Sequence, residues 1–149
     1  MDIKSPEERS KNMAAIRSKN TKPEVYFRKL LFANGYRYSL NSKTVPGHPD
    51  IYLRKYNTAI FVHGCFWHRH GGCKYAYMPK SRLEFWQKKF EDNKRRDKIV
   101  VQELDKKGEK WIIIWECSIK KMQRDNVAQE KILRIVEKFL ISNNRNLEI

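Results

Sequence analysis

Four side chains of the kinds that bind zinc occur in a pattern that suits a single ion. Cys65, His70 and Cys73 fall within nine residues, the pair Gly71-Gly72 lets the chain turn tightly between them, and Cys117 is the remaining cysteine. Zinc is bound by four thiolate or imidazole ligands in a tetrahedron, and a site filled by four protein ligands has a structural role. The alternative is three unrelated buried thiols and a surface histidine. The close spacing favours a structural zinc site.

A second set of residues has the chemistry of phosphodiester hydrolysis. Asp50 is a hard oxygen ligand suited to Mg²⁺, and His63 and His68 carry the side chain that most often serves as a base or an acid in catalysis. Together they form a plausible nuclease site. For Asp50, an equally supported alternative is a turn-capping role directly after Pro49.

Large aromatic residues accompany these two sets. Phe66 and Trp67 lie between the expected zinc ligands, and Trp86 follows further along the chain. One interpretation places them in the core. The other makes them a wedge driven between base pairs, at the cost of unstacking a distorted or mismatched step. A loop held by zinc favours the wedge at least as much as the core.

The elements that must position these residues alternate between helical and strand patterns. Asp50 heads a short apolar strand, 59–63 forms a second strand beside it, and the apolar run 110–117 reads as a buried central strand. Further elements are expected as a helix at 9–17, a helix from 22 to a stop at 34–35, a strand at 36–40, one broken or two successive helices at 81–107, and a helix at 125–141. This order predicts an α/β sandwich around a mixed sheet.

The first residues of the chain combine capping signals with positive charge. Residues 1–20 are interpreted as a basic arm that orders on DNA, the alternative being a frayed N-terminal helix. Thr21 and Glu24 have the spacing of a capping box at the start of the next helix. From the residues alone, Glu24 is therefore interpreted as a helix cap.

Length and charge restrict the class of protein. A chain of 149 residues is long enough for one domain with a single core. Its net charge of +15 indicates a partner that is a polyanion, with nucleic acid first and anionic lipid as the alternative. No apolar run reaches membrane-spanning length and no signal-peptide core is present, so we expect a cytoplasmic protein with no membrane contact. Three cysteines fit reduced, metal-binding use, and a monomer is the default expectation.

Several of these segments, in this order, closely resemble the very-short-patch-repair (Vsr) DNA mismatch endonucleases. The similarity extends from about Arg9 to Cys117 and rests on four motifs: residues 13–24 (MAAIRSKNTKPE), 46–51 (PGHPDI), 61–68 (FVHGCFWH) and 115–117 (WEC). The resemblance implies a restriction-endonuclease-like, three-layer fold. It also implies an enzyme that nicks one strand on the 5′ side of the thymine in a T·G mismatch, left by deamination of 5-methylcytosine, in double-stranded DNA.

The resemblance assigns roles to the residues of the expected nuclease site. It implies that Asp50 binds Mg²⁺ together with the backbone carbonyl of Val62. His63 and His68 match the catalytic histidines. Glu24 matches an active-site acid that orients one of the histidines, although the capping role remains open.

The resemblance also covers the remaining positions. Cys65, His70, Cys73 and Cys117 match the structural zinc ligands. The positions that match the intercalating residues are Phe66, Trp67, Trp86 and, in the N-terminal arm, Met13.

Two features depart from the family pattern, and two other functions remain open. Val62 stands where relatives often have threonine, and the spacing from His70 to Cys73 is one residue longer than in some relatives. The open alternatives are a restriction-type endonuclease that cuts intact sequence and a zinc-stabilised DNA-binding module without catalysis. Repair proteins are possible partners.

Overall fold

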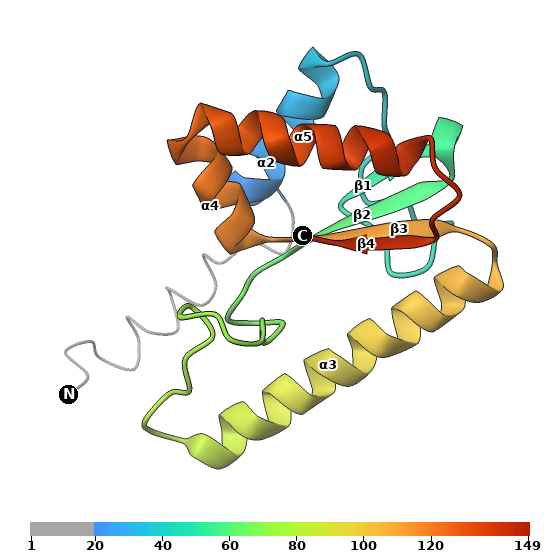
Figure 1. The fold of residues 1–149 in the computed structure, drawn as a ribbon. Helices are drawn as coiled ribbons and strands as arrows, with labels where there is room; N and C mark the ends of the chain where they lie inside the picture. Colours follow the sequence, from blue (N-terminus) through green and yellow to red (C-terminus); the bar gives the residue numbers. More distant parts are fainter. Residues whose placement is uncertain (1–19) are drawn as a thin grey trace.

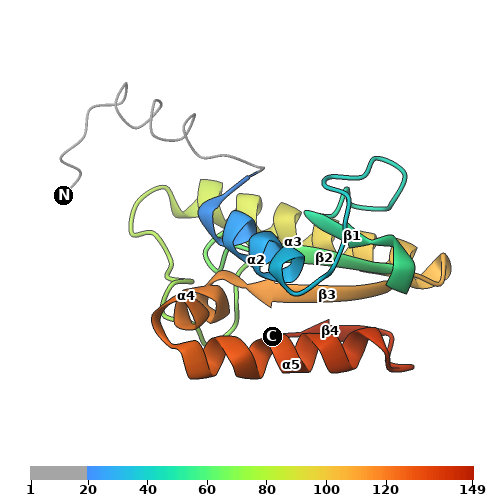
Figure 2. The same ribbon diagram turned by 90° about the horizontal axis from the view of Figure 1, so that it is seen from above.

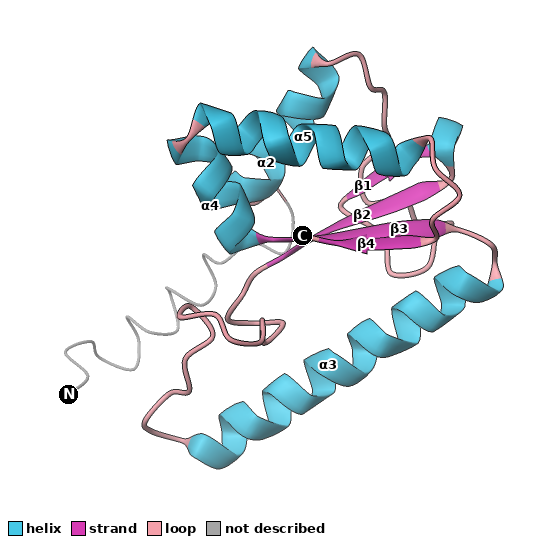
Figure 3. Ribbon diagram, in the orientation of Figure 1, coloured by secondary structure: helices cyan, strands magenta, loops and turns pink. Residues whose placement is uncertain are grey.

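A four-stranded mixed sheet forms the centre of the computed structural model, which describes residues 20–149 (Figures 1 and 3). The strands follow one another in the order β1-β2-β3-β4. Their bounds are Ile51–Leu53 for β1, Thr58–His63 for β2, Lys110–Trp115 for β3 and Asn146–Glu148 for β4. β1 pairs with β2 in antiparallel orientation, whereas β2–β3 and β3–β4 are parallel pairs.

Helices cover both faces of this sheet, which gives three layers. The helices are α2 (Lys22–Ala33), α3 (Leu83–Lys106), α4 (Glu116–Arg124) and α5 (Asn126–Leu140), with a 3-10 turn η1 at Arg54–Tyr56. Figure 1 shows α2, α4 and α5 on one side of the sheet and α3 on the other. From above, α2 lies toward β1 and β2, and α5 toward β4 (Figure 2). The predicted α/β class with a mixed central sheet is therefore confirmed.

Two hydrophobic clusters explain why the layers stay together. Alternate residues of a strand point to opposite faces, so Ile112 and Ile114 pack toward α2, α4 and α5, while Ile113 packs toward α3. On α3, Phe90 and Leu104 are the two buried residues, and they lie fourteen positions apart on the same face of the helix. Burial on both faces accounts for the continuous apolar run of β3.

Three expected elements differ in the structure. Residues 36–40 contribute only an isolated bridge between Ser39 and Tyr52. The region 81–107 contains one unbroken helix of 24 residues rather than a broken or double one. The expected strand 110–117 ends at Trp115, so Cys117 belongs to the first turn of α4.

Two elements and one cap were not anticipated in their observed form. Helix α4 and strand β4 were not predicted from the sequence. The short segment Asn146–Glu148 carries no apolar pattern, and its pairing with the backbone of β3 makes it a strand. Thr21 precedes α2 but its side chain makes no capping hydrogen bond. The expected helix at 9–17 and the arm of residues 1–20, apart from Asn20, lie outside the described residues. Within residues 20–149, no helix has both the length and the apolar character needed to cross a membrane.

Candidate active site and metal centre

Asp50 and Val62 meet where strand β1 begins. The backbone N–H of Val62 donates a hydrogen bond of 2.7 Å to Oδ2 of Asp50. Pairing between β1 and β2 extends only to Ile51 and Ile60, so Val62 lies beyond the last paired residue on this edge. The N–H and C=O of one strand residue point to the same edge. The carbonyl of Val62 therefore lies on the side of Asp50, where no strand residue of β1 takes it up.

The carboxyl group of Asp50 is an unusual acid. Its pKa is raised from 3.8 to about 7, mainly because burial removes the group from water; the nearby Glu24 carboxylate also raises the pKa, while the Val62 amide and His68 lower it. A buried carboxylate that has no lysine or arginine beside it is costly, because it loses its hydration. A bound cation would offset this cost. Asp50 and the adjacent backbone carbonyl thus provide the oxygen donors that Mg²⁺ prefers.

Glu24 is almost completely buried, with 2% of its surface exposed. Burial raises the pKa of its carboxyl group, whereas the backbone amides of Asn20 and Thr21 and the Arg28 guanidinium lower it. Glu24 occupies the position of a capping glutamate in the first turn of α2, three residues after Thr21. Oε1 of Glu24 has no hydrogen-bond partner among the described residues. Glu24 therefore combines a cap position with an effect on Asp50.

His63 and His68 come from different segments and lie face to face. His63 is the last residue of β2, and His68 follows in the loop after Cys65. Their ring centroids are 3.8 Å apart and the rings are nearly parallel, at 6°. Burial and the neighbouring His68 lower the pKa of His63 to about 3. In the unliganded protein His63 is therefore a neutral imidazole at physiological pH.

Asp97 completes this group, and it was absent from the residues singled out by sequence. Its Oδ2 lies 2.6 Å from Nδ1 of His68, and it could join both histidines around one cation. The hydrogen-bond partner of His68 is thus Asp97, whereas no hydrogen bond between Glu24 and either histidine is present in residues 20–149. A signal existed: Phe90 and Asp97 are seven residues apart on α3, which places Asp97 on the helix face that is turned toward the sheet. The sequence does not distinguish Asp97 from the other acidic residues of α3, of which it is one of six.

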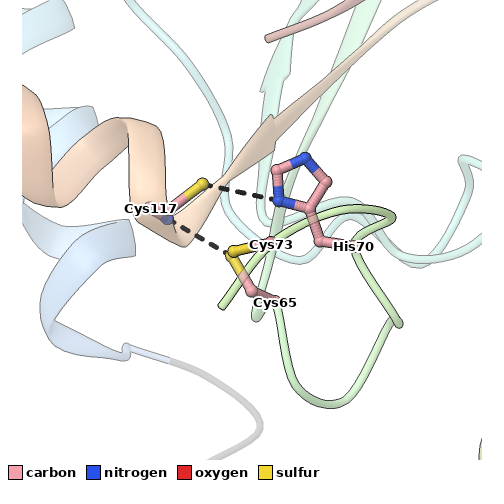
Figure 4. Close-up of side chains that lie close together, drawn as sticks. All are labelled: Cys65, His70, Cys73 and Cys117. Atoms are coloured by element: carbon pink, nitrogen blue, oxygen red, sulfur yellow. Dashed lines mark hydrogen bonds between the residues drawn. The ribbon is translucent and has the colours of Figure 1, made fainter. Parts of the chain in front are cut away.

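The predicted zinc ligands converge from two parts of the chain. Cys65, His70, Cys73 and Cys117 place their ligand atoms within 4.8 Å of one another (Figure 4). The first three belong to the loop after β2, and Cys117 comes from the first turn of α4. The sequence-predicted set is brought together in full by the described structure.

The geometry of this cluster fits a tetrahedral ion. Sγ of Cys117 lies 3.4 Å from Nδ1 of His70. Bond lengths of about 2.3 Å to sulfur and about 2.0 Å to nitrogen separate two ligands of a tetrahedral zinc by about 3.5 Å. The imidazole of His70 stacks on Trp115 at 4.2 Å, and the amide of Cys117 donates to Sγ of Cys65. These contacts hold the ligands in place, which is what a structural metal site requires.

The predicted aromatic residues form one cluster beside the zinc-ligand loop. Phe66 is surrounded at 5.1–5.6 Å by the rings of Trp67, Trp86, Tyr77 and Phe90. The three predicted residues are half-buried, so they are neither core nor fully projecting. The amide of Asn93 donates to the carbonyl of Trp67 and ties this loop to α3. Met13, the fourth predicted residue, lies outside the described residues.

Comparison with known proteins places the chain among DNA endonucleases. The family model described as DNA mismatch endonuclease Vsr matches residues 1–74. The type II nicking enzyme V.NmeAIP of Neisseria meningitidis serogroup A is 44% identical over 138 residues, which are 93% of this chain and 96% of that protein. The type II nicking enzyme V.XorIIP of Xanthomonas oryzae pv. oryzae is 44% identical over 79% of this chain and 86% of its own length. The DNA mismatch endonuclease Vsr of Escherichia coli K12 is 32% identical over 99% of this chain and 93% of its own length.

Proposed function

Because the chain belongs to the DNA mismatch endonuclease Vsr family, we propose that it is a Mg²⁺-dependent DNA endonuclease that initiates very short patch repair. In this proposal it nicks one strand on the 5′ side of the thymine in a T·G mismatch that arose by deamination of 5-methylcytosine. The observation that carries the proposal is the meeting of Asp50, His63, His68 and Asp97 in one pocket beside a loop of half-buried aromatic residues.

Asp50 and the carbonyl of Val62 are the proposed magnesium ligands. The hydrogen bond from the Val62 amide fixes the carboxylate beside that carbonyl. When bound, Mg²⁺ polarises the phosphate and offsets charge that develops on its oxygens. Glu24 adds negative charge behind Asp50, which strengthens the attraction of this position for a cation. The backbone contribution of Val62 does not depend on its side chain, so the replacement of threonine there is compatible with the role.

The two histidines and Asp97 are proposed to handle protons and orient the phosphate. A carboxylate at Nδ1 of His68 favours the tautomer with its proton on that nitrogen, which leaves Nε2 free to accept a proton from water. His63 is neutral in the unliganded protein, so it suits a hydrogen-bond donor or acceptor better than a permanent acid. Stacking of the two rings restricts both orientations.

The aromatic cluster and the basic arm are proposed to recognise the duplex. Phe66, Trp67 and Trp86 would enter the distorted step at the mismatch, with Met13 approaching from the minor groove. A T·G pair is more weakly stacked and paired than a matched pair, so the cost of separating bases is lowest there. The zinc-ligand cluster holds the loop that carries Phe66 and Trp67. We propose a monomer as the acting unit, with double-stranded DNA as its partner and repair proteins acting later.

A restriction-type endonuclease that cuts intact sequence is the second candidate. The observation in its favour is that several relatives are named type II nicking enzymes. A zinc-stabilised module that only binds DNA is disfavoured, because binding alone does not require two histidines and two acids within one pocket. Which duplexes the protein cuts, mismatched only, matched as well or neither, therefore distinguishes the three candidate functions.

A strand-nicking assay tests the proposal directly. The protein and Mg²⁺ are mixed with paired duplexes that differ by one T·G or C·G pair, each strand carrying its own label. We expect a single cut beside the mismatched thymine and none in the matched duplex. Equal cutting of both would support the restriction-type enzyme. Binding without a cut, with or without cytosine methylation, would overturn catalysis by this site.

A further inference from the structure

The pocket over the candidate active site contains an arginine that neither the sequence motifs nor the catalytic set includes. This pocket has a volume of about 610 Å³, and its lining residues include Asp50, His63, His68 and Asp97. Within residues 20–149, Arg96, from α3, is the only lysine or arginine that lines it. Among these described residues it therefore provides the only permanent positive charge on the pocket wall.

The charge of the pocket makes such a group necessary. Asp50 and Asp97 are both acidic, and Glu24 lies near Asp50, whereas the proposed substrate brings a phosphodiester with its own negative charge. Like charges at contact distance repel strongly where water is displaced. A metal at Asp50 offsets part of this repulsion. A fixed cation on the wall offsets more, and it remains in place between turnovers.

Arg96 is free to perform this role, in contrast to its neighbour. No ion pair or side-chain hydrogen bond of Arg96 is present within residues 20–149, and the residue is exposed. Arg95, one position earlier, pairs with Asp92 at 3.3 Å and does not line the pocket. A guanidinium group offers a planar set of donors that matches two oxygens of a phosphate.

The backbone positions around Arg96 are firmly held. Helix α3 packs on the sheet through the buried residues Phe90 and Leu104. Gly47, which also lines the pocket, adopts φ +79°, and a Cβ there would come within 2.5 Å of Val100 on α3. The loop that carries Gly47 is therefore in close contact with α3. This contact restricts where a phosphate can lie relative to Arg96.

We propose that Arg96 binds a non-bridging oxygen of the backbone phosphodiester that enters the pocket. The proposal rests on the proposed nuclease function and adds to it a named substrate contact. Because Arg96 is next to Asp97, the same turn of α3 would hold the phosphate and orient His68. Arg96 would then serve both binding and the positioning of the phosphate for attack.

Neutral phosphate analogues test this contact without requiring cleavage. Duplexes with a T·G pair carry a single methylphosphonate at successive linkages around the thymine, and their dissociation constants are measured in Ca²⁺ for the wild-type protein, Arg96→Ala and Arg95→Ala. One linkage should weaken wild-type binding about tenfold, the value of one charge-assisted hydrogen bond. Arg96→Ala should bind the unmodified duplex about tenfold more weakly and lose sensitivity at that linkage.

Arg95→Ala is the matched control, and the outcomes are separable. It should keep the full methylphosphonate effect, because its guanidinium group faces Asp92 rather than the pocket. Arg96→Lys should bind more tightly than Arg96→Ala but more weakly than the wild type, because an ammonium group cannot contact two phosphate oxygens in the way that a guanidinium group does. An Arg96→Ala protein that folds normally and retains the same sensitivity at every linkage would overturn the proposal. If the wild type shows the contact but cuts no duplex in Mg²⁺, the nuclease function fails while the phosphate contact stands.

Discussion

Oδ2 of Asp97 lies 2.6 Å from Nδ1 of His68, and this pair joins helix α3 to the zinc-ligand loop. The carboxylate holds one tautomer of the imidazole, so we expect Asp97→Asn to lower the single-turnover nicking rate roughly 100-fold. Binding of the mismatched duplex should change little. Asp92→Asn is the control, because Asp92 is on the same helix but pairs with the exposed Arg95. An unchanged nicking rate in Asp97→Asn would remove the pair from the mechanism.

Asp50→Ala should abolish nicking while DNA binding survives. The substitution removes the carboxylate that is proposed to bind Mg²⁺, but it leaves the positive surface and the aromatic cluster intact. The measurement combines a nicking assay with a gel-shift assay on the same T·G duplex. Cleavage by Asp50→Ala at the wild-type rate would refute the assignment of the metal ligand.

The same carboxyl group should make the protein less stable as the pH rises. The pKa of Asp50 is about 7 in the folded state against an ordinary value of 3.8, so the folded state binds more protons between these two values. The free energy of unfolding therefore falls as the pH rises through this window, by on the order of 2–4 kcal/mol without Mg²⁺. Asp50→Asn cannot ionise, so it should be more stable than the wild type near pH 8 and not near pH 4.

Denaturant unfolding of both proteins at several pH values, in Mg²⁺-free buffer, measures this difference. The lowered pKa of His63 has the opposite consequence, since stability is lost as the pH falls below its unfolded value of 6.5. Both proteins share His63, so its contribution cancels in the comparison. A stability gap that does not change with pH would show that Asp50 has an ordinary pKa.

Removal of one zinc ligand should release the metal and loosen the loop. We expect one zinc per wild-type chain by atomic absorption and loss of that zinc in Cys73→Ser, with a lower free energy of unfolding and loss of nicking. His48→Ala is the control for zinc content and stability only, because His48 is an exposed histidine outside the zinc-ligand cluster but lines the active-site pocket. Full zinc content in Cys73→Ser, or no zinc in the wild type, would contradict the assignment.

Trp67→Ala should reduce the preference for mismatched DNA. Stacking of one base on an aromatic ring contributes roughly 1–3 kcal/mol, so the ratio of T·G to C·G nicking should fall by about tenfold or more. Phe32→Ala serves as a control, since Phe32 is exposed on α2 and outside the aromatic cluster. Equal selectivity in Trp67→Ala and the wild type would return Trp67 to a packing role.

The zinc-ligand cluster was predictable because its chemistry is rare. Thiols and imidazoles at close spacing have few other uses, and Cys117 was the only cysteine left to complete the set. The central strand β3 was also predictable, since the run 111–115 is apolar on both faces. In these cases side-chain type alone carries the information.

Other features depend on contacts that side-chain type does not reveal. Asp97 differs from five other acids on α3 only by the direction in which it points. Strand β4 is held by backbone hydrogen bonds to β3, which a short polar segment such as Asn146–Glu148 does not announce. The role of Arg96 depends on which residues face it across a pocket. Each of these required the tertiary arrangement.

A metal ion in the zinc-ligand cluster would also cross-link two distant points of the chain. Cys65 precedes the crossover that contains α3, and Cys117 follows it, so an ion bound to both would join two points about fifty residues apart. Such a link limits the freedom of the unfolded chain in the way that a disulfide does, and a loop of this length corresponds to about 4 kcal/mol in the chain-entropy model. The parallel pair β2–β3 needs this same crossover to close before its hydrogen bonds can form. Metal bound early would thus shorten the search for the central strand pairing, and refolding should be faster with zinc than without it.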